Sequence, residues 1–213
     1  MELTKKNFSI LCGSLVMICA FTFCGKFIRY IDLAAFRILA QVVIYLLMGF
    51  TAWIAMKCSG MSMEMDFKNK RQYFIGVAIA FSLAIVIGVI PALCGFSLVG
   101  QHQNFSWFGI TYEFLRCLLV IGPVEEFVFR VYLQDAFVSF FGKRKWLGVV
   151  IAAFLFGGWH IINGFLMQGF FTFGIGLIFG FAKYKIKDCT YLSVALGHGM
   201  YDFLIALVQM FIL

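Results

Sequence analysis

Three apolar stretches of this chain contain carboxylate or imidazole side chains. The first carries the adjacent carboxylates Glu125 and Glu126. The second ends at His160, and the third contains His198 and Asp202. A charge in an apolar environment is costly unless it meets a partner or water. The sequence therefore predicts that these side chains face one shared hydrated pocket.

This set of side chains is suited to activating a water molecule. A carboxylate with two imidazoles can bind a water and remove its proton, which makes the water a nucleophile. Two histidines and a carboxylate also form a zinc site with one open position. With either mechanism the activated water attacks an amide carbonyl, so the sequence predicts peptide hydrolysis. The candidate catalytic residues, which are also the candidate metal ligands, are Glu125, His160, His198 and Asp202.

Helical spacing divides these residues between faces. Glu126 and Arg130 are four residues apart, so they can pair on one face of a helix. That pairing leaves Glu125 to face the pocket, because successive residues of a helix point about 100° apart. His198 and Asp202 are also four residues apart and share a face.

Two further patterns indicate structural roles. Glu113 and Arg116 are three residues apart and predict a local ion pair. Gly176 and Gly180 form a G-x-x-x-G pattern, which lets helices approach closely. We expect the glycine pair to pack inside the bundle, with dimerisation as the alternative.

The composition shows which elements must position these side chains. Of 213 residues, 63% are hydrophobic and only 13% are charged. Soluble domains are about 45–50% apolar and about 25% charged. The surroundings of most of this chain must therefore be lipid, which excludes an ordinary soluble enzyme, a disordered chain and a nucleic-acid-binding domain. The net charge of +7 is interpreted as loop charge that orients the chain in the membrane.

Seven apolar segments are long enough, or nearly so, to cross a membrane, which takes about 20 residues. We expect an all-α, polytopic membrane bundle of about seven transmembrane helices, forming one domain over 1–213 with the motifs in 108–213. The fourth span is expected to end near Arg130, with 131–142 along the cytoplasmic interface. The segments are 8–28, 34–56, 73–95, 108–130, 146–163, 165–182 and 190–213.

The basic residues predict the orientation, because cytoplasmic loops carry an excess of Lys and Arg. This excess places the N-terminus in the cytoplasm and the C-terminus outside, in the cell membrane if the chain is bacterial. One loop disagrees, since Lys26, Arg29 and Arg37 fall on the outer side; snorkelling from helix ends would explain them. The cytoplasmic set is Lys57, Lys68, Lys70, Arg71, Lys143, Arg144, Lys145, Lys183, Lys185 and Lys187.

The ordered motifs resemble those of the CPBP intramembrane proteases. This family includes the type II CAAX prenyl endopeptidases and the bacteriocin-processing or self-immunity proteins, often called the Abi family. The resemblance covers about 110–202. It rests on Glu-Glu-x-x-x-Arg (Glu125, Glu126, Arg130), Phe-x-x-x-His (Phe156, His160) and His-x-x-x-Asp (His198, Asp202).

The resemblance implies a helical bundle with a cavity open toward the cytoplasm. It implies that Glu125, with His160, activates the water. His198 and Asp202 would then stabilise the oxyanion or help to hold a metal. The family analogy leaves both a zinc mechanism and a metal-free glutamate mechanism open.

The resemblance also assigns Glu126 and Arg130 to the support of these residues. One position departs from the pattern, because the prenyl endopeptidases have Asn where this chain has Asp202. An ionised aspartate cannot donate a hydrogen bond to an oxyanion. Asp202 is therefore expected to ligate a metal or to orient His198.

The expected partners are the lipid bilayer and a membrane-associated peptide substrate. The resemblance implies either a prenylated protein C-terminus or a peptide precursor, and the short chain favours a bacterial peptide-processing or immunity role. Two alternatives remain. One is a catalytically silent membrane scaffold or immunity protein. The other is a proton-coupled carrier, since buried acids and histidines also build proton relays.

Overall fold

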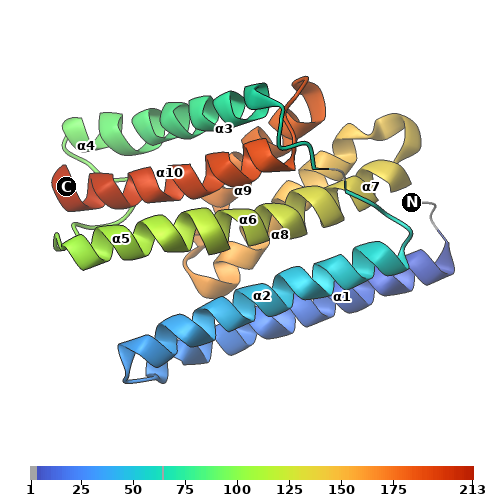
Figure 1. Ribbon diagram of the computed structural model, residues 1–213, viewed down its shortest axis with the longest axis horizontal. Helices are drawn as coiled ribbons and strands as arrows, with labels where there is room; N and C mark the ends of the chain where they lie inside the picture. Colours follow the sequence, from blue (N-terminus) through green and yellow to red (C-terminus); the bar gives the residue numbers. More distant parts are fainter. Residues whose placement is uncertain (1–3, 64) are drawn as a thin grey trace. The chain divides into compact units, whose positions relative to one another are not determined.

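The computed structural model describes residues 4–63 and 65–213 of the chain. Throughout these residues the regular structure is helical, with no β-strand (Figure 1). Each of the seven predicted apolar segments coincides with helix. The predicted all-α fold is confirmed.

Several of these helices are long and apolar enough to cross a membrane. They expose large apolar side chains such as Val16, Phe36 and Leu46, which suits contact with lipid. This supports the prediction of an integral, multi-pass membrane protein. The predicted span over 108–130 is also helical. It is not among the helices of the described residues that are long and apolar enough to cross a membrane. They are Lys5–Ile28, Ala34–Cys58, Lys70–Leu93, Leu166–Lys185 and Tyr191–Phe211, with a shorter apolar helix at Trp146–Ile162.

The helices form two compact units that alternate along the chain. Unit 1 comprises Met1–Glu64 and Phe127–Ile186, and unit 2 comprises Met65–Glu126 and Lys187–Leu213. The placement of the units relative to each other is not determined, so each is described by itself. The expectation of one domain over the whole chain stays a prediction.

Unit 1 is built from two pairs of packed helices and a connecting helical segment. The helices α1 and α2 form a hairpin, and α8 packs along α9 (Figure 1). Helix α7 packs against α8. The elements are α1 (Lys5–Gly25), η1 (Lys26–Tyr30), α2 (Ala34–Cys58), η4 (Phe127–Leu133), α7 (Gln134–Phe140), η5 (Gly142–Arg144), α8 (Trp146–Asn163) and α9 (Leu166–Lys185).

The predicted glycine pair of unit 1 packs within the chain. A Cβ atom added at Gly176 would lie 3.1 Å from the ring of Phe156, and one at Gly180 would lie 2.8 Å from Val149. Both neighbours belong to α8. The close contact of α8 and α9 therefore depends on the missing side chains, as small-residue packing requires.

Unit 2 places α10 between the helices that precede it in the chain. Helix α10 packs along α3 on one side and along α5, η3 and α6 on another (Figure 1). The elements are α3 (Lys70–Leu83), η2 (Ala84–Val89), α4 (Ile90–Leu93), α5 (Trp107–Arg116), η3 (Cys117–Ile121), α6 (Gly122–Glu126) and α10 (Tyr191–Phe211).

Polar caps fix where the helices of unit 2 begin. The side chain of Asn69 accepts a hydrogen bond from the Arg71 amide at the start of α3. Thr190 and Ser193 form a capping box at the start of α10. Such caps satisfy backbone N–H groups that have no partner inside the helix. The first residues of α3 and α10 therefore follow from local sequence.

Each of the two prolines of the chain follows a π-helical turn. The residue before Pro91 bonds back five positions, from Ile90 N to Ile85 O. The residue before Pro123 does the same, from Gly122 N to Cys117 O. A proline ring clashes with the carbonyl four residues earlier and supplies no N–H of its own. The preceding turn therefore widens, and such π turns are frequent at functional sites.

One expectation about the fourth span is wrong. The structure continues as helix through Arg130 in η4 and α7, and it ends at Phe140. Residues of this continuation, including Tyr132 and Leu133, are buried in unit 1. Their apolar packing continues the helix past Arg130. The predicted end came from depth, because a straight helix back from Lys143 would place Glu125 deeper than His160 and His198.

Candidate active site

The site in unit 2 is built where α10 meets η3 and α6 at van der Waals distance. A Cβ atom at Gly122 would lie 2.6 Å from the carbonyl oxygen of Ala195. One at Gly199 would lie 2.5 Å from the carbonyl oxygen of Cys117. Only glycine permits two backbones to approach this closely. The crossing brings the helix turn that carries the double glutamate onto the turn of α10 that carries His198.

A side-chain hydrogen bond secures the same crossing nearer the start of α10. The hydroxyl of Tyr191 donates to the carbonyl oxygen of Pro123, at 3.0 Å. This carbonyl lies in α6, two residues after the π turn over Cys117–Ile121. The contact therefore ties the start of α10 to the turn that precedes the two glutamates.

His198 is buried and held by a carboxylate of another helix. Its Nδ1 lies 2.8 Å from Glu126 Oε1, and both side chains are buried. An ionised carboxylate only accepts hydrogen bonds, so Nδ1 carries the proton and donates it. Glu126 therefore sets the orientation of the imidazole.

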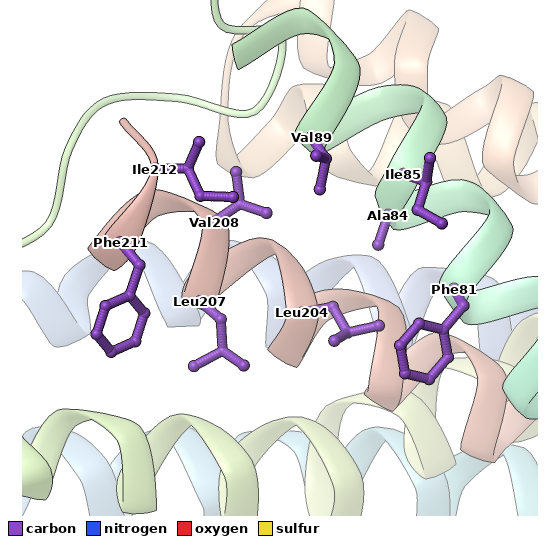
Figure 2. A pocket seen from close by; sticks show the side chains of 9 residues that line it. All are labelled: Phe81, Ala84, Ile85, Val89, Leu204, Leu207, Val208, Phe211 and Ile212. Carbon is purple, nitrogen blue, oxygen red and sulfur yellow. The ribbon is translucent and has the colours of Figure 1, made fainter. Parts of the chain in front are cut away.

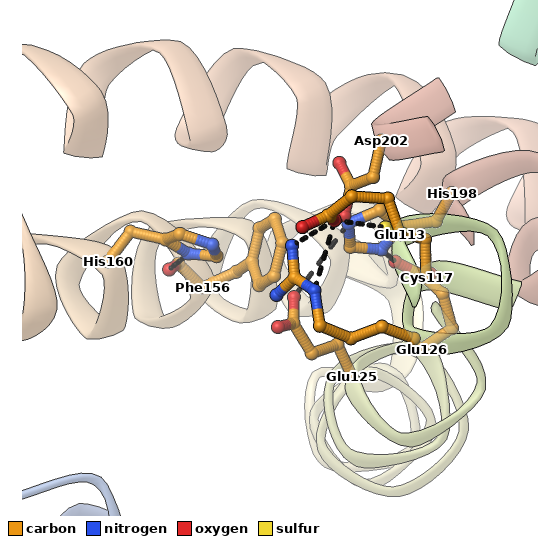
Figure 3. Close-up of polar contacts among 9 residues, drawn as sticks. Glu113, Cys117, Glu125, Glu126, Phe156, His160, His198 and Asp202 are labelled. Carbon is orange, nitrogen blue, oxygen red and sulfur yellow. Dashed lines mark hydrogen bonds and ion pairs between the residues drawn. The ribbon is translucent and has the colours of Figure 1, made fainter. Parts of the chain in front are cut away.

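The other ring nitrogen of His198 faces two further carboxylates. Its Nε2 lies 3.8 Å from Glu125 Oε2 and 3.5 Å from Asp202 Oδ2. Figure 3 shows the three carboxylates gathered around this one imidazole. The site thus combines a buried carboxylate that can accept a proton with an imidazole that is already oriented.

The predicted ion pair on α5 is confirmed, and it borders this group. Arg116 donates from Nε and from a terminal nitrogen to the same oxygen of Glu113, at 3.0 and 2.6 Å. The thiol of Cys117 lies 3.6 Å from that oxygen. The carboxylate of Glu113 is thereby neutralised locally, so it is not offered as a catalytic group.

The remaining motif residues lie in unit 1. His160 Nδ1 is 2.9 Å from the carbonyl oxygen of Phe156, one turn earlier in α8. The Arg130 guanidinium carbon lies 4.2 Å from the centre of the Phe156 ring. Arg130 and Phe156 are buried, and His160 is half-buried.

The structure thus brings together three of the four predicted catalytic residues within one unit: Glu125, His198 and Asp202. The inclusion of His160 in the same pocket stays a prediction, and so does the pairing of Glu126 with Arg130. What the sequence reasoning missed is the hydrogen bond between Glu126 and His198. The sequence signal for this bond was a second acid, Glu126, directly after Glu125 in an apolar segment, because a buried acid needs a partner.

Unit 2 also contains a separate cavity that is lined by apolar side chains. It measures about 400 Å³, and it lies between α3, η2 and the C-terminal part of α10 (Figure 2). Its lining offers no titratable side chain, so it is not a second catalytic site. The lining residues are Phe81, Ala84, Ile85, Val89, Leu204, Leu207, Val208, Phe211 and Ile212.

A zinc ion would need at least three protein ligands directed at one point. Across residues 4–63 and 65–213, no group of three or more His, Cys, Asp or Glu side chains is arranged to hold a metal ion. Zinc binding by the candidate ligands, which include His160 of unit 1, stays a prediction.

Comparison with known proteins adds a family to this geometry. Residues 106–204 match the family model described as Type II CAAX prenyl endopeptidase Rce1-like. The matched range contains all three motifs and every candidate site residue. Searches of curated proteins and of solved structures give no match. The match confirms the resemblance seen in the motifs: residues 106–204 are similar to the Rce1-like type II CAAX prenyl endopeptidase family.

Proposed function

We propose that the protein is an intramembrane endopeptidase that hydrolyses a peptide bond by a metal-free glutamate mechanism. The observation that supports this most directly is the group of buried Glu125 and half-buried Asp202 around His198, inside the region that matches the family. Buried acids and histidines in a membrane protein mark functional sites by default, because their burial is costly.

In the proposed mechanism Glu125 is the general base. Its carboxylate takes a proton from a water molecule, and the resulting hydroxide attacks the carbonyl carbon of the scissile peptide bond. His160, by family analogy, helps to orient this water. The proton on Glu125 then passes to the leaving nitrogen as the carbon–nitrogen bond breaks, so that an acid and an amine are released.

His198 supplies the complementary charge. With Nδ1 donating to Glu126, a proton on Nε2 can be donated to the oxyanion of the tetrahedral intermediate. Asp202 lies beside this nitrogen, so it orients the imidazole and compensates its positive charge. The aspartate thereby has a role without donating a hydrogen bond itself.

The substrate is proposed as a membrane-associated peptide or protein. The family description favours a prenylated C-terminus, and a peptide precursor is the second member of the same chemical class. We also propose that the N-terminus lies in the cytoplasm and the C-terminus outside, since the basic loops follow that pattern.

A cleavage assay on the purified full chain tests the proposal. A panel of prenylated and unmodified peptides is incubated with the wild type and with Glu125→Gln. Loss of a general base lowers the rate by about 10²- to 10⁴-fold, so the variant is expected to be nearly inactive. Asp135→Asn is the matched control, because it makes the same change in a carboxylate that pairs with Lys183 in unit 1.

The alternatives correspond to other outcomes. If the Glu125→Gln variant cleaves as fast as the wild type, the glutamate mechanism is wrong. If neither protein cleaves any peptide but both retain biological activity, the protein is a scaffold. Proton-coupled uptake into reconstituted vesicles without cleavage would identify a carrier.

A further inference from the structure

The aromatic residue Phe156 of unit 1 is not assigned a role by the proposed chemistry, although it contacts His160 in two ways. Its carbonyl oxygen lies 2.9 Å from His160 Nδ1. Its ring lies at 75° to the imidazole, with 4.5 Å between the ring centres. The same residue therefore reaches His160 through its backbone and through its side chain.

The backbone contact fixes which nitrogen carries the proton. A carbonyl oxygen only accepts, so Nδ1 of His160 must be the donor. In the neutral imidazole the lone pair is then on Nε2. This is the form that can accept a hydrogen bond or a proton from a water molecule on the other side of the ring.

The side-chain contact fixes the direction of the ring. The ring of Trp159 also contacts the imidazole, at 4.7 Å and 89° between the rings. The edge-to-face geometry of both pairs is the favourable arrangement for aromatic rings. His160 is therefore contacted by two aromatic rings of its own helix, α8.

Phe156 is itself held by groups from two other elements. On η4, the guanidinium of Arg130 lies over its ring at 4.2 Å, and the ring of Phe129 lies 5.0 Å away. On α9, Gly176 leaves the space that the ring occupies. A cation–π contact is stronger for a desolvated guanidinium than for an exposed one, so this ring is anchored more firmly than an ordinary apolar side chain.

We propose that Phe156 is a positioning residue, whose ring, clamped by Arg130, holds His160 in the Nδ1–H form with Nε2 directed away from α8. This inference rests on the proposed function for the claim that His160 serves catalysis. The geometry that carries it lies wholly within unit 1 and needs only the described contacts.

The test combines a spectroscopic and a kinetic measurement on the full chain. Histidine labelled with nitrogen-15 distinguishes the Nδ1–H from the Nε2–H form, and the chain has only three histidines, so His160→Gln assigns the signal. Phe156→Leu keeps the backbone carbonyl but removes the aromatic ring that holds the imidazole toward it. We therefore expect a single Nδ1–H form in the wild type, and a mixture of forms in Phe156→Leu because the imidazole can then turn away from the carbonyl. Small displacements of a catalytic group cost up to about 10²-fold in rate, so kcat is expected to fall on the order of tenfold or more with KM unchanged.

Two further variants keep this test decisive. Phe154→Leu is the matched control, because Phe154 lies on the same helix but is exposed, and it should leave both measurements unchanged. Phe156→Met keeps the buried apolar volume if the leucine variant does not fold, and it should behave like that variant. Phe156→Tyr keeps the ring and is expected to recover most of the activity.

The outcomes separate this proposal from the function on which it rests. An unchanged His160 spectrum in both the leucine and methionine variants would overturn the positioning role, whatever the kinetics. A higher KM with unchanged kcat in these variants would overturn the positioning role as well. If the wild type cleaves nothing, the proposed function fails, while the spectra still decide whether Phe156 controls His160.

Discussion

At the scale of single residues, the orientation of His198 depends on Glu126. Sequence spacing had predicted a different partner for this acid, Arg130. Spacing along one helix finds partners such as Glu126 and Arg130, which are four residues apart. It cannot find a partner on another helix, and the hydrogen bond from His198 to Glu126 joins α10 to α6. The catalytic types were predictable from their cost in an apolar segment, but this pairing was not.

Replacement of Glu126 should therefore act through His198. Glu126→Leu leaves a buried N–H without its acceptor, which costs about 1–3 kcal/mol of unfolding free energy. We expect kcat to fall on the order of 10²-fold, because the imidazole loses its fixed orientation. Glu126→Gln keeps an acceptor oxygen and should lose much less. Cleavage rates and unfolding of the purified variants measure both effects, and equal rates for Leu and Gln would refute the role.

At the scale of elements, the length of the apolar segments was enough to predict the helices. The predicted end of the fourth helix was wrong. The depth expected for Glu125 below Lys143 predicted an end near Arg130, but burial of Tyr132 and Leu133 continues the helix to Phe140. The π turns were also not predicted, although a proline in an apolar run is the visible signal. Their effect on direction matters most at Pro123, which lies two residues before Glu125.

Pro123→Ala tests whether the distorted turn positions the glutamates. With alanine the N–H returns and the clash disappears, so the turn over Cys117–Ile121 can close as an ordinary α-helix. A change of one residue in register turns the following side chains by about 100°, which moves Glu125 away from His198. We expect cleavage to fall by at least about tenfold while helix content by circular dichroism is retained. Pro91→Ala repairs the other π turn and should remain active; equal activity of the two variants would contradict this reasoning.

At the scale of the whole molecule, composition predicted a lipid-embedded bundle but not its division into two units. Hydrophobicity shows which residues avoid water, and in a membrane every helix satisfies that condition alike. Which helices pack together depends on small residues and on polar contacts across helices. The family match over residues 106–204 covers parts of both units.

Whether catalysis requires a metal is tested on the whole protein. Because the proposed mechanism uses Glu125 and no metal to activate the water, we expect a strong chelator to leave the rate of peptide cleavage unchanged. Metal analysis of the purified protein provides the companion measurement. Inhibition by the chelator, followed by recovery on addition of zinc, would instead favour the zinc mechanism.

The contact between the backbones at Gly122 and Gly199 has a consequence for protein engineering. A library that randomises every position of the chain should retain only glycine at both of these positions, even though neither has a side chain to contribute to hydrolysis. Anyone seeking new cleavage preferences should leave this pair untouched and vary positions that face away from it. Conversely, a survivor with alanine at both would reveal that the helices can slide apart and still work.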